Sequence, residues 1–220
     1  MNKLATLVLL ALGLAVADAT IHTMCFNYFL NKDKCVNGAA GQNIRCNADP
    51  KPHEAPVAKF VMQTPPPKQA HNGGKNRLER RYDTYHKVLE MSSGQGICGT
   101  YDSDRQDGVC LWSGPEQDNP TVHTAGWLNG IKKSNCGKQV YIQRKDKSKG
   151  PFYVPVLDGC SFETTKLEEG CFEIGVTKSL AAKLTIFPNE TSGPDSGYLY
   201  GGFTWDFNNL DGTNSAAGPV

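Results

Sequence analysis

The sequence has no marked excess of charge of either sign, because 23 basic side chains stand against 22 acidic ones, for a formal net charge of +1. A field that weak gives no basis for attraction to nucleic acid or to an anionic membrane surface. Past its N-terminal segment, the sequence also lacks any run of about 20 apolar residues, the length that a transmembrane helix needs. We therefore expect neither nucleic acid nor a membrane as the partner of this chain.

Motifs of the common catalytic and metal centres are missing as well. The chain has no Gly-x-Ser-x-Gly sequence, which carries the nucleophile of many serine hydrolases, and no Cys-x-x-Cys pair, which is typical of zinc and redox sites. No histidine follows His123, so the C-terminal part lacks the side chain that most often serves as a general base. We expect neither a metal nor a cofactor.

Cysteine, glycine and proline, by contrast, are abundant. Eight cysteines in 220 residues are typical of a disulfide-bonded secreted protein, and 23 glycines with 13 prolines indicate a turn-rich β fold. At the N-terminus, Lys3 precedes an apolar run over residues 4–16, and Ala17 and Ala19 fit the rule for signal-peptide cleavage before Thr20. The sequence predicts a signal peptide over residues 1–19 and a secreted, extracellular protein.

The mature chain divides into four parts. Residues 20–49 form a small cap that contains cysteines and is too short for a core of its own. Residues 50–81 are a Pro/Gly-rich linker, expected to be extended and exposed, and they end in the dibasic pair Arg80 and Arg81. That pair is either a processing site for a protease or a solvated basic turn. Residues 82–210 are the folded domain, and residues 211–220 are a flexible tail.

The domain is predicted to be mainly β. Val140 and Ile142 alternate with more polar neighbours, as expected of a half-buried strand, and the polar segment 145–150 is typical of a hairpin turn. Residues 122–133 and 176–182 have helical spacing. The predicted strands cover residues 139–143, 152–157, 183–187, 198–200 and 202–207. This pattern favours a small β-barrel or sandwich with one or two short helices.

Five short motifs follow one another in residues 94–207: Gly96-Ile97-Cys98-Gly99-Thr100-Tyr101, Asn135-Cys136-Gly137-Lys138, Val154-Pro155-Val156-Leu157-Asp158-Gly159-Cys160, Gly170-Cys171-Phe172-Glu173-Ile174 and Gly202-Phe203-Thr204-Trp205-Asp206-Phe207. Their order resembles the secreted double-psi β-barrel superfamily, which includes barwin, the expansin N-terminal domain, RlpA-like proteins and many fungal secreted proteins. The resemblance covers a little over half of the chain. It implies a six-stranded closed barrel, preceded here by the cap and the linker.

The cysteines divide unevenly between the cap and the domain. The cap contains Cys25, Cys35 and Cys46, and the domain contains five more, at Cys98, Cys110, Cys136, Cys160 and Cys171. Because both numbers are odd, at least one bridge must join the cap to the domain if all eight cysteines pair. The connectivity itself stays open.

Asp158 is the first candidate for chemistry. The resemblance to lytic transglycosylases and expansins implies an aspartate in an open groove that acts on, or contacts, polysaccharide. Cleavage of a glycosidic bond needs a second carboxylate about 5–9.5 Å away, and Glu173, Asp102 and Asp104 are the candidates. Alternatively, Asp158 caps backbone amides of its turn. We favour capping, because expansin-related endoglucanases have His-Phe-Asp where this chain has Cys-Phe-Glu, ending in Glu173.

Other side chains have weaker patterns. Asp102, Asp104, Asp107 and Gly108 approach the spacing of a calcium loop, but the last aspartate and the glycine come one place late, which favours a solvated acidic turn. Aromatic side chains that could contact a glycan or another partner are Trp112, Tyr198 and Tyr200, whereas Trp205 is expected in the core. Asn189 begins an N-glycosylation sequon.

Two classes of function follow. The first is a secreted, non-catalytic double-psi β-barrel protein, expected to be a monomer, that binds a host protein or a cell-wall polysaccharide. The cap, linker and barrel resemble secreted proteins of plant-associated fungi, some of which act as effectors at the host interface. The second is a polysaccharide-modifying protein of the expansin or endoglucanase type, a glycoside hydrolase or lytic transglycosylase, that uses Asp158 with Glu173, Asp102 or Asp104.

Overall fold

The structure is a computed structural model that describes residues 21–34, 36, 82–83, 88–144, 148–186, 198–199, 203–208 and 217–220. The predicted signal peptide and linker, Cys35, Cys46, Asn189 and Tyr200 lie outside the described residues. The described helices are α1 (Met24–Asp33), α2 (Leu167–Gly170) and α3 (Lys178–Leu184). The described strands are β1 (Tyr82–Asp83), β2 (Val88–Met91), β3 (Gly94–Gly96), β4 (Gly99–Tyr101), β5 (Val109–Trp112), β6 (Gln139–Arg144), β7 (Phe152–Cys160), β8 (Ile174–Thr177), β9 (Tyr198–Leu199) and β10 (Phe203–Phe207).

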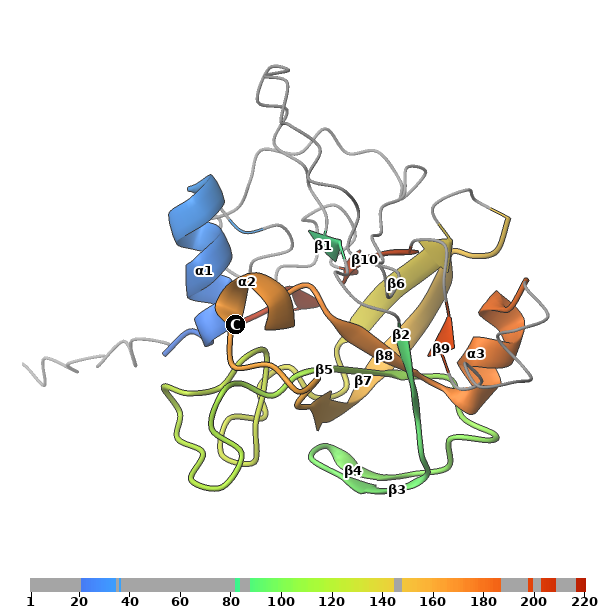
Figure 1. The fold of residues 1–220 in the computed structure, drawn as a ribbon, viewed down its shortest axis with the longest axis horizontal. Helices are drawn as coiled ribbons and strands as arrows, with labels where there is room; N and C mark the ends of the chain where they lie inside the picture. The colour runs from blue at the N-terminus through green and yellow to red at the C-terminus, as the bar shows by residue number, and fades with distance from the viewer. Residues whose placement is uncertain are drawn as a thin grey trace, which may run out of the picture.

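One mixed β-sheet dominates the fold (Figure 1). Its eight strands lie in the order β1-β10-β6-β7-β5-β8-β2-β9, and β3 with β4 forms a separate hairpin. β5 runs parallel to β7, and β2 runs parallel to β8, whereas the other neighbouring strands are antiparallel. The prediction of a mainly β domain is confirmed. Its strand order contains eight segments, of which the two-residue segments β1 and β9 lie at the two ends.

The two strands β6 and β7 confirm the predictions for residues 139–143 and 152–157, and both extend further than predicted. They form an antiparallel pair in which Gln139 lies opposite Pro155 and Ile142 opposite Phe152. The predicted half-burial of β6 is wrong, because Tyr141 and Gln143 are buried as well as Val140 and Ile142. Both faces of this strand are therefore covered.

Three tryptophans lie at the centre of the core. Trp112, Trp127 and Trp205 are fully buried, and the Trp127 and Trp205 rings meet edge to face with centroids 6.1 Å apart. Each indole N–H donates to a backbone carbonyl: Trp112 to Thr164, Trp127 to Cys171 and Trp205 to Phe172. Burial therefore leaves none of these donors without an acceptor.

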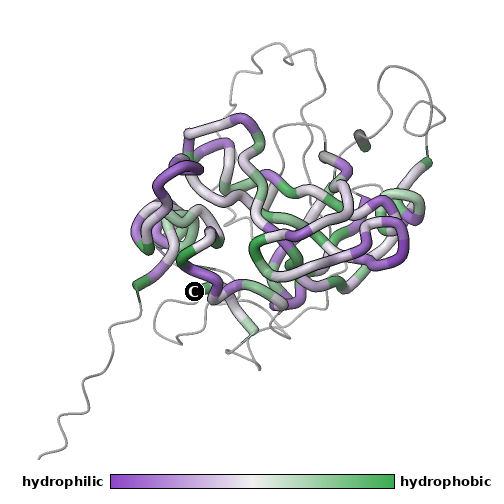
Figure 2. Tube along the Cα trace, turned by 90° about the horizontal axis from the view of Figure 1, so that it is seen from below, coloured by the Kyte–Doolittle hydropathy of each residue, from purple (hydrophilic) through white to green (hydrophobic). Residues whose placement is uncertain are grey.

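Many of the most hydrophilic stretches lie at the outer bends of the trace (Figure 2).

The two predicted helices have different outcomes. Residues 176–182 overlap α3, which begins after Thr177, whose side-chain oxygen accepts from the Leu180 amide as an N-cap. Residues 122–133 form turns and no helix. The Asn129 side chain holds those turns, since its Oδ1 accepts from the amides of Ile131 and Lys132 at 3.0 and 2.8 Å. The apolar spacing that suggested a helix reflects Trp127 and Leu128, which enter the core from a turn.

The predictions at the C-terminal end of the domain were partly right. A strand over residues 183–187 is wrong, because α3 extends to Leu184 and the Thr185 side chain donates to the carbonyl of Ala181. β9 and β10 fall within the predicted strands 198–200 and 202–207. The expectation that Trp205 lies in the core is confirmed.

The described part of the cap consists mainly of α1, a helix that the sequence analysis did not predict. Thr23 caps it by accepting from the Phe26 amide at 3.4 Å, and Cys25, Phe26 and Phe29 face the core. A disulfide joins Cys25 to Cys171, which is the predicted covalent link between cap and domain. The helix therefore shares the core of the domain and packs beside α2 (Figure 1).

Two further disulfides connect Cys98 to Cys136 and Cys110 to Cys160, so every cysteine in the described residues is paired. Three disulfides indicate an oxidising compartment, as in secreted proteins. None of the described helices is long and apolar enough to cross a membrane.

The last four residues are docked, which corrects the prediction of a flexible tail for residues 217–220; residues 211–216 lie outside the described part. The Val220 amide donates to Oδ1 of Asn135 at 3.1 Å, and the Val220 carbonyl accepts from the Thr23 amide at 3.2 Å. The Lys138 Nζ donates to the Gly218 carbonyl. The C-terminal end thus lies beside the start of α1 (Figure 1).

Candidate functional site

Asp158 lies near the end of β7, opposite Cys110 of the parallel strand β5. Its Oδ1 accepts hydrogen bonds from the amides of Ile97 at 2.6 Å and Gly159 at 2.8 Å. Its Oδ2 accepts from the hydroxyl of Tyr101 at 3.0 Å. Each oxygen accepts at least one hydrogen bond, and the side chain caps backbone amides, as in the second of the two alternatives considered for it.

Two of these three donors belong to the hairpin of β3 and β4, which lies against β7. Gly96 ends β3, and a Cβ on it would lie 2.5 Å from Cγ of Asp158, so a residue with a side chain would push the carboxylate away. The turn of the hairpin contains Cys98, and its disulfide to Cys136 fixes it to the segment before β6. A carboxylate and a disulfide therefore both hold the hairpin on the sheet.

Tyr101 acts as a hydrogen-bond donor to Asp158 throughout the physiological pH range. Burial, the negative charge of Asp158 and the hydrogen bond between them raise the pKa of the Tyr101 hydroxyl to about 12. A general acid has to transfer its own proton to a leaving group. The contacts of Asp158 are instead three donors that point at its oxygens, which is the arrangement of a structural acceptor.

The other candidate carboxylates lie elsewhere. Glu173 is only 1% exposed and comes directly before β8, and β5 separates β8 from β7. Asp102 and Asp104 lie in an exposed turn after β4. Their carboxylates face cations, with Asp102 3.7 Å from Arg105 and Asp104 3.5 Å from Lys178. The hydrogen-bond donors of Asp158 are Ile97, Gly159 and Tyr101, whereas the ion pairs of Asp102 and Asp104 are with Arg105 and Lys178.

Asp107 belongs to the segment whose spacing approaches that of a calcium loop, and it connects this segment to α3. Asp107 accepts from the Ser179 hydroxyl at 2.7 Å and forms an ion pair with Lys183, both of which belong to α3. Burial by itself would raise the pKa of Asp107, but the hydrogen bonds from Lys183 and Ser179 and the Lys183 charge outweigh it and lower the pKa. Within the described residues, no three histidine, cysteine or acidic side chains are grouped as metal ligands.

Of the three aromatic side chains predicted to contact a partner, the structure describes that of Trp112. Trp112, predicted at the surface, is fully buried, because its ring packs so closely against Gly170 that a Cβ there would lie 2.3 Å away. Tyr198 belongs to β9, but its side chain, like the whole of Tyr200, lies outside the description. Among the described side chains of the sheet, Tyr153 is an exposed aromatic one, with 45% of its surface accessible, and the sequence analysis did not select it.

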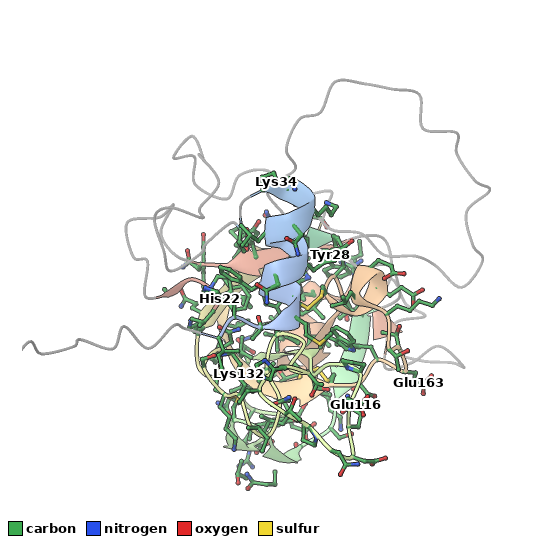
Figure 3. All side chains as sticks on the ribbon, turned by 90° about the vertical axis from the view of Figure 1, so that its left-hand side faces the viewer. His22, Tyr28, Lys34, Glu116, Lys132 and Glu163 are labelled. Carbon is green, nitrogen blue, oxygen red and sulfur yellow. A yellow bond between two sulfur atoms is a disulfide. The ribbon has the colours of Figure 1, made fainter. Side chains whose placement is uncertain are left out.

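A groove between α1 and α2 also escaped the sequence analysis. It has a volume of about 510 Å³ and is lined by one stripe of α1 and by the first residue of α2. Tyr28 lies on the side of α1 toward α2 (Figure 3). The lining residues are Met24, Asn27, Tyr28, Asn31, Lys32 and Leu167. The helical spacing of the α1 residues and the capping Thr23 were the available signals for this groove.

Comparison with known proteins adds little. No family model matches the chain, and no curated protein sequence matches it. Among solved structures, Streptomyces papain inhibitor is similar over 55% of this chain and 89% of its own chain, with 24% sequence identity and a TM-score of 0.34. A likeness this slight assigns neither a family nor a partner to the chain.

Proposed function

We propose that the protein is a secreted, non-catalytic double-psi β-barrel module that binds a protein or a glycan. The observation that carries this proposal is the state of Asp158, whose two oxygens accept three hydrogen bonds from Ile97, Gly159 and Tyr101. Chemistry at a glycosidic bond requires two carboxylates across an open site. Here one carboxylate holds a hairpin, and Glu173 is buried beyond an intervening strand.

The pairing register supports a closed barrel. β1 pairs with β10 through Tyr82 opposite Trp205, and β2 pairs with β9 through Val88 opposite Leu199. Moving six residues forward from Tyr82 to Val88 thus moves the partner six residues back, from Trp205 to Leu199. In an antiparallel pair this is the relation between two positions of one ladder. The β1–β10 and β2–β9 pairs therefore share one register, as expected if β1 with β2, and β9 with β10, are parts of the same two strands.

Joining those segments turns the linear order of strands into a ring. A barrel closed in this way would have six strands and no free edge, with the β1–β10 and β2–β9 pairs closing the ring. The parallel pairs β2–β8 and β5–β7 are the mixed feature expected of crossing psi connections. A closed barrel suits short strands, because it leaves no unpaired backbone at an edge.

The closure can be tested by nuclear magnetic resonance on the full mature chain. We expect cross-strand contacts between Tyr82 and Trp205 and between Val88 and Leu199 in the same sample, with slow amide exchange in both pairs. Contacts between β1 and β10 in any other register would contradict the closed barrel.

The absence of catalysis is tested by incubating the mature protein with cellulose, β-1,3-glucan, chitin and peptidoglycan and measuring two quantities. We expect depletion of protein from the supernatant by a polymer, or capture of a defined protein partner, and no release of reducing sugar or cleaved glycan. The alternative, a polysaccharide-modifying enzyme, would be supported by product that disappears in Asp158→Asn at an unchanged melting temperature. A protein that binds nothing and cleaves nothing would contradict the proposal as well.

A further inference from the structure

The groove between α1 and α2 presents polar groups that are not used within the described structure. The Tyr28 hydroxyl and the Asn31 side-chain amide have no hydrogen-bond partner in the described part of the chain, and the Asn27 amide has one weak bond, 3.5 Å to the His22 carbonyl. Asn27 and Asn31 are one helical turn apart, with Tyr28 on the same side. The helix therefore offers two amide groups, each a donor and an acceptor, and one hydroxyl along a single edge.

The groove is supported by a fixed scaffold. Cys25, in the first turn of α1, is joined to Cys171, which precedes β8. Phe29 packs on Phe172 with centroids 5.0 Å apart and on Trp127 with centroids 5.9 Å apart. A site on a helix held this way is preorganised, so a ligand would not have to order it. Met24 and Leu167 supply the apolar part of its lining.

Two ion pairs lie beside the groove, and the Glu168 carboxylate lies close enough to act on Tyr28. Lys32 lies 3.0 Å from Asp33, and Lys166 at the start of α2 lies 2.9 Å from Glu169. Burial raises the pKa of the Tyr28 hydroxyl, and the charges of Glu168 and Asp33 raise it further, so the hydroxyl stays protonated. With both signs present, the site offers no net field that selects an anion or a cation.

We propose that this groove binds a neutral oligosaccharide, an inference that rests on the proposed binding function and names its ligand class and site. A sugar ring presents hydroxyl groups, each a donor and an acceptor, on its rim and apolar C–H groups on its faces. The amides of Asn27 and Asn31 and the Tyr28 hydroxyl match the rim, and Met24 and Leu167 match the faces. The groove, with a volume of about 510 Å³, is open to solvent, a shape that suits an extended chain better than an enclosed small molecule.

A protein partner fits this groove less well. Protein interfaces are centred on apolar or aromatic anchors in closely packed, desolvated pockets. Most of the accessible lining surface is apolar, but the two apolar side chains, Met24 and Leu167, come from different helices, and the other four lining residues carry polar groups. Binding of a protein through these residues is therefore the competing outcome of the test.

The test is calorimetric titration of the full mature protein with cellohexaose, laminarihexaose, chitohexaose and xylohexaose, with a hexagalacturonate as the charged comparison. We expect at least one neutral hexasaccharide to bind, and the double variant Tyr28→Phe with Asn31→Ala to weaken it about tenfold or more. Tyr28→Phe keeps the ring contacts with Phe29 and Phe172 and removes only the hydroxyl. The matched control, Tyr153→Phe with Asn119→Ala at exposed positions, should retain wild-type affinity.

Three results would overturn the inference. Oligosaccharide binding that is equal in the groove variant and in the control would leave the proposed function intact and remove this site. Binding of a protein that the groove variant abolishes, with no oligosaccharide bound, would assign the groove to a protein. Tighter binding of the hexagalacturonate than of every neutral sugar would contradict a neutral ligand. Thermal unfolding of each variant, with an unchanged melting temperature, shows that the fold is retained.

Discussion

Asp158 joins residues that are far apart in the sequence, since its donors Ile97 and Tyr101 are 61 and 57 residues away. In Asp158→Asn, one oxygen remains to accept from amides, but an amino group replaces the other and the charge is lost. We expect the free energy of unfolding to fall by about 1.5–3 kcal/mol, the usual worth of hydrogen bonds to a charged group. Thermal and urea denaturation would measure it.

Asp158→Ala should cost more than Asp158→Asn, because it leaves the amides of Ile97 and Gly159 without an acceptor. Equal stability of wild type and both variants would contradict the capping role.

Sequence reasoning could predict part of this site. A short acidic side chain in a glycine-containing turn indicated amide capping at Asp158. Its partners could not be predicted, because they depend on how a distant hairpin packs. Trp112 shows the same limit: its neighbours Ser113 and Gly114 suggested a surface turn, but Gly170 of α2 provides the space that buries its ring. Contacts between distant segments decide both cases.

Lys138 gives a prediction at alkaline pH. Burial, with a smaller contribution from the Lys132 charge, lowers the pKa of Lys138 to about 8. The ordinary value is about 10.4, so between these two pH values the folded state binds fewer protons than the unfolded state. The contribution of Lys138 to the free energy of unfolding therefore rises as the pH increases from about 8 to about 10.

Urea denaturation at a series of pH values would measure this rise. The difference in unfolding free energy between wild type and Lys138→Met should change with pH over that interval. Parallel curves for the two proteins would show that Lys138 titrates normally.

At the scale of elements, the sequence predicted β6, β7 and β10 because their alternating or continuous apolar residues lie in strands of the main sheet. It failed for residues 122–133, where apolar spacing close to that of a helix occurs in turns held by the Asn129 side chain. It also missed α1, whose apolar residues Cys25, Phe26 and Phe29 were few and lay in a polar segment. Local patterns were informative only where the element was long and regular.

Asp107, in the segment before β5, contacts α3, and these contacts lead to a prediction about stability at acid pH. The pKa of Asp107 is lowered, so its contribution to stability is complete above the ordinary carboxyl value of about 3.9 and is lost as the pH falls through the lower, folded value. Asp107→Asn should remove about 0.2–1 kcal/mol at neutral pH, the range for a partly exposed ion pair. The variant should also lose less stability than wild type on acidification.

Denaturation midpoints at pH 7 and below pH 4 would measure this difference. Asp118→Asn, at an exposed position in another loop, serves as the control and should behave as wild type. A constant difference between Asp107→Asn and wild type at both pH values would contradict the assignment.

For the whole molecule, the Cys25–Cys171 disulfide closes a loop of 146 residues. The odd numbers of cysteines predicted a link of this kind, but only the packing of α1 on Phe172 and Trp127 decides which residues form it. In Cys25→Ser with Cys171→Ser, we expect a loss of about 2–4 kcal/mol in the free energy of unfolding, chiefly because the unfolded chain gains freedom. A urea midpoint equal to that of wild type would contradict this.

The same disulfide would keep the two parts of the molecule joined if the backbone between Cys25 and Cys171 were cut. Cys25 lies before residues 37–81, and Cys171 lies after them. A protease that cut after Arg81 would produce a second polypeptide beginning at Tyr82, the first residue of β1, and the disulfide would keep it attached to the first. The two polypeptides would migrate as one species without reductant and as two with it.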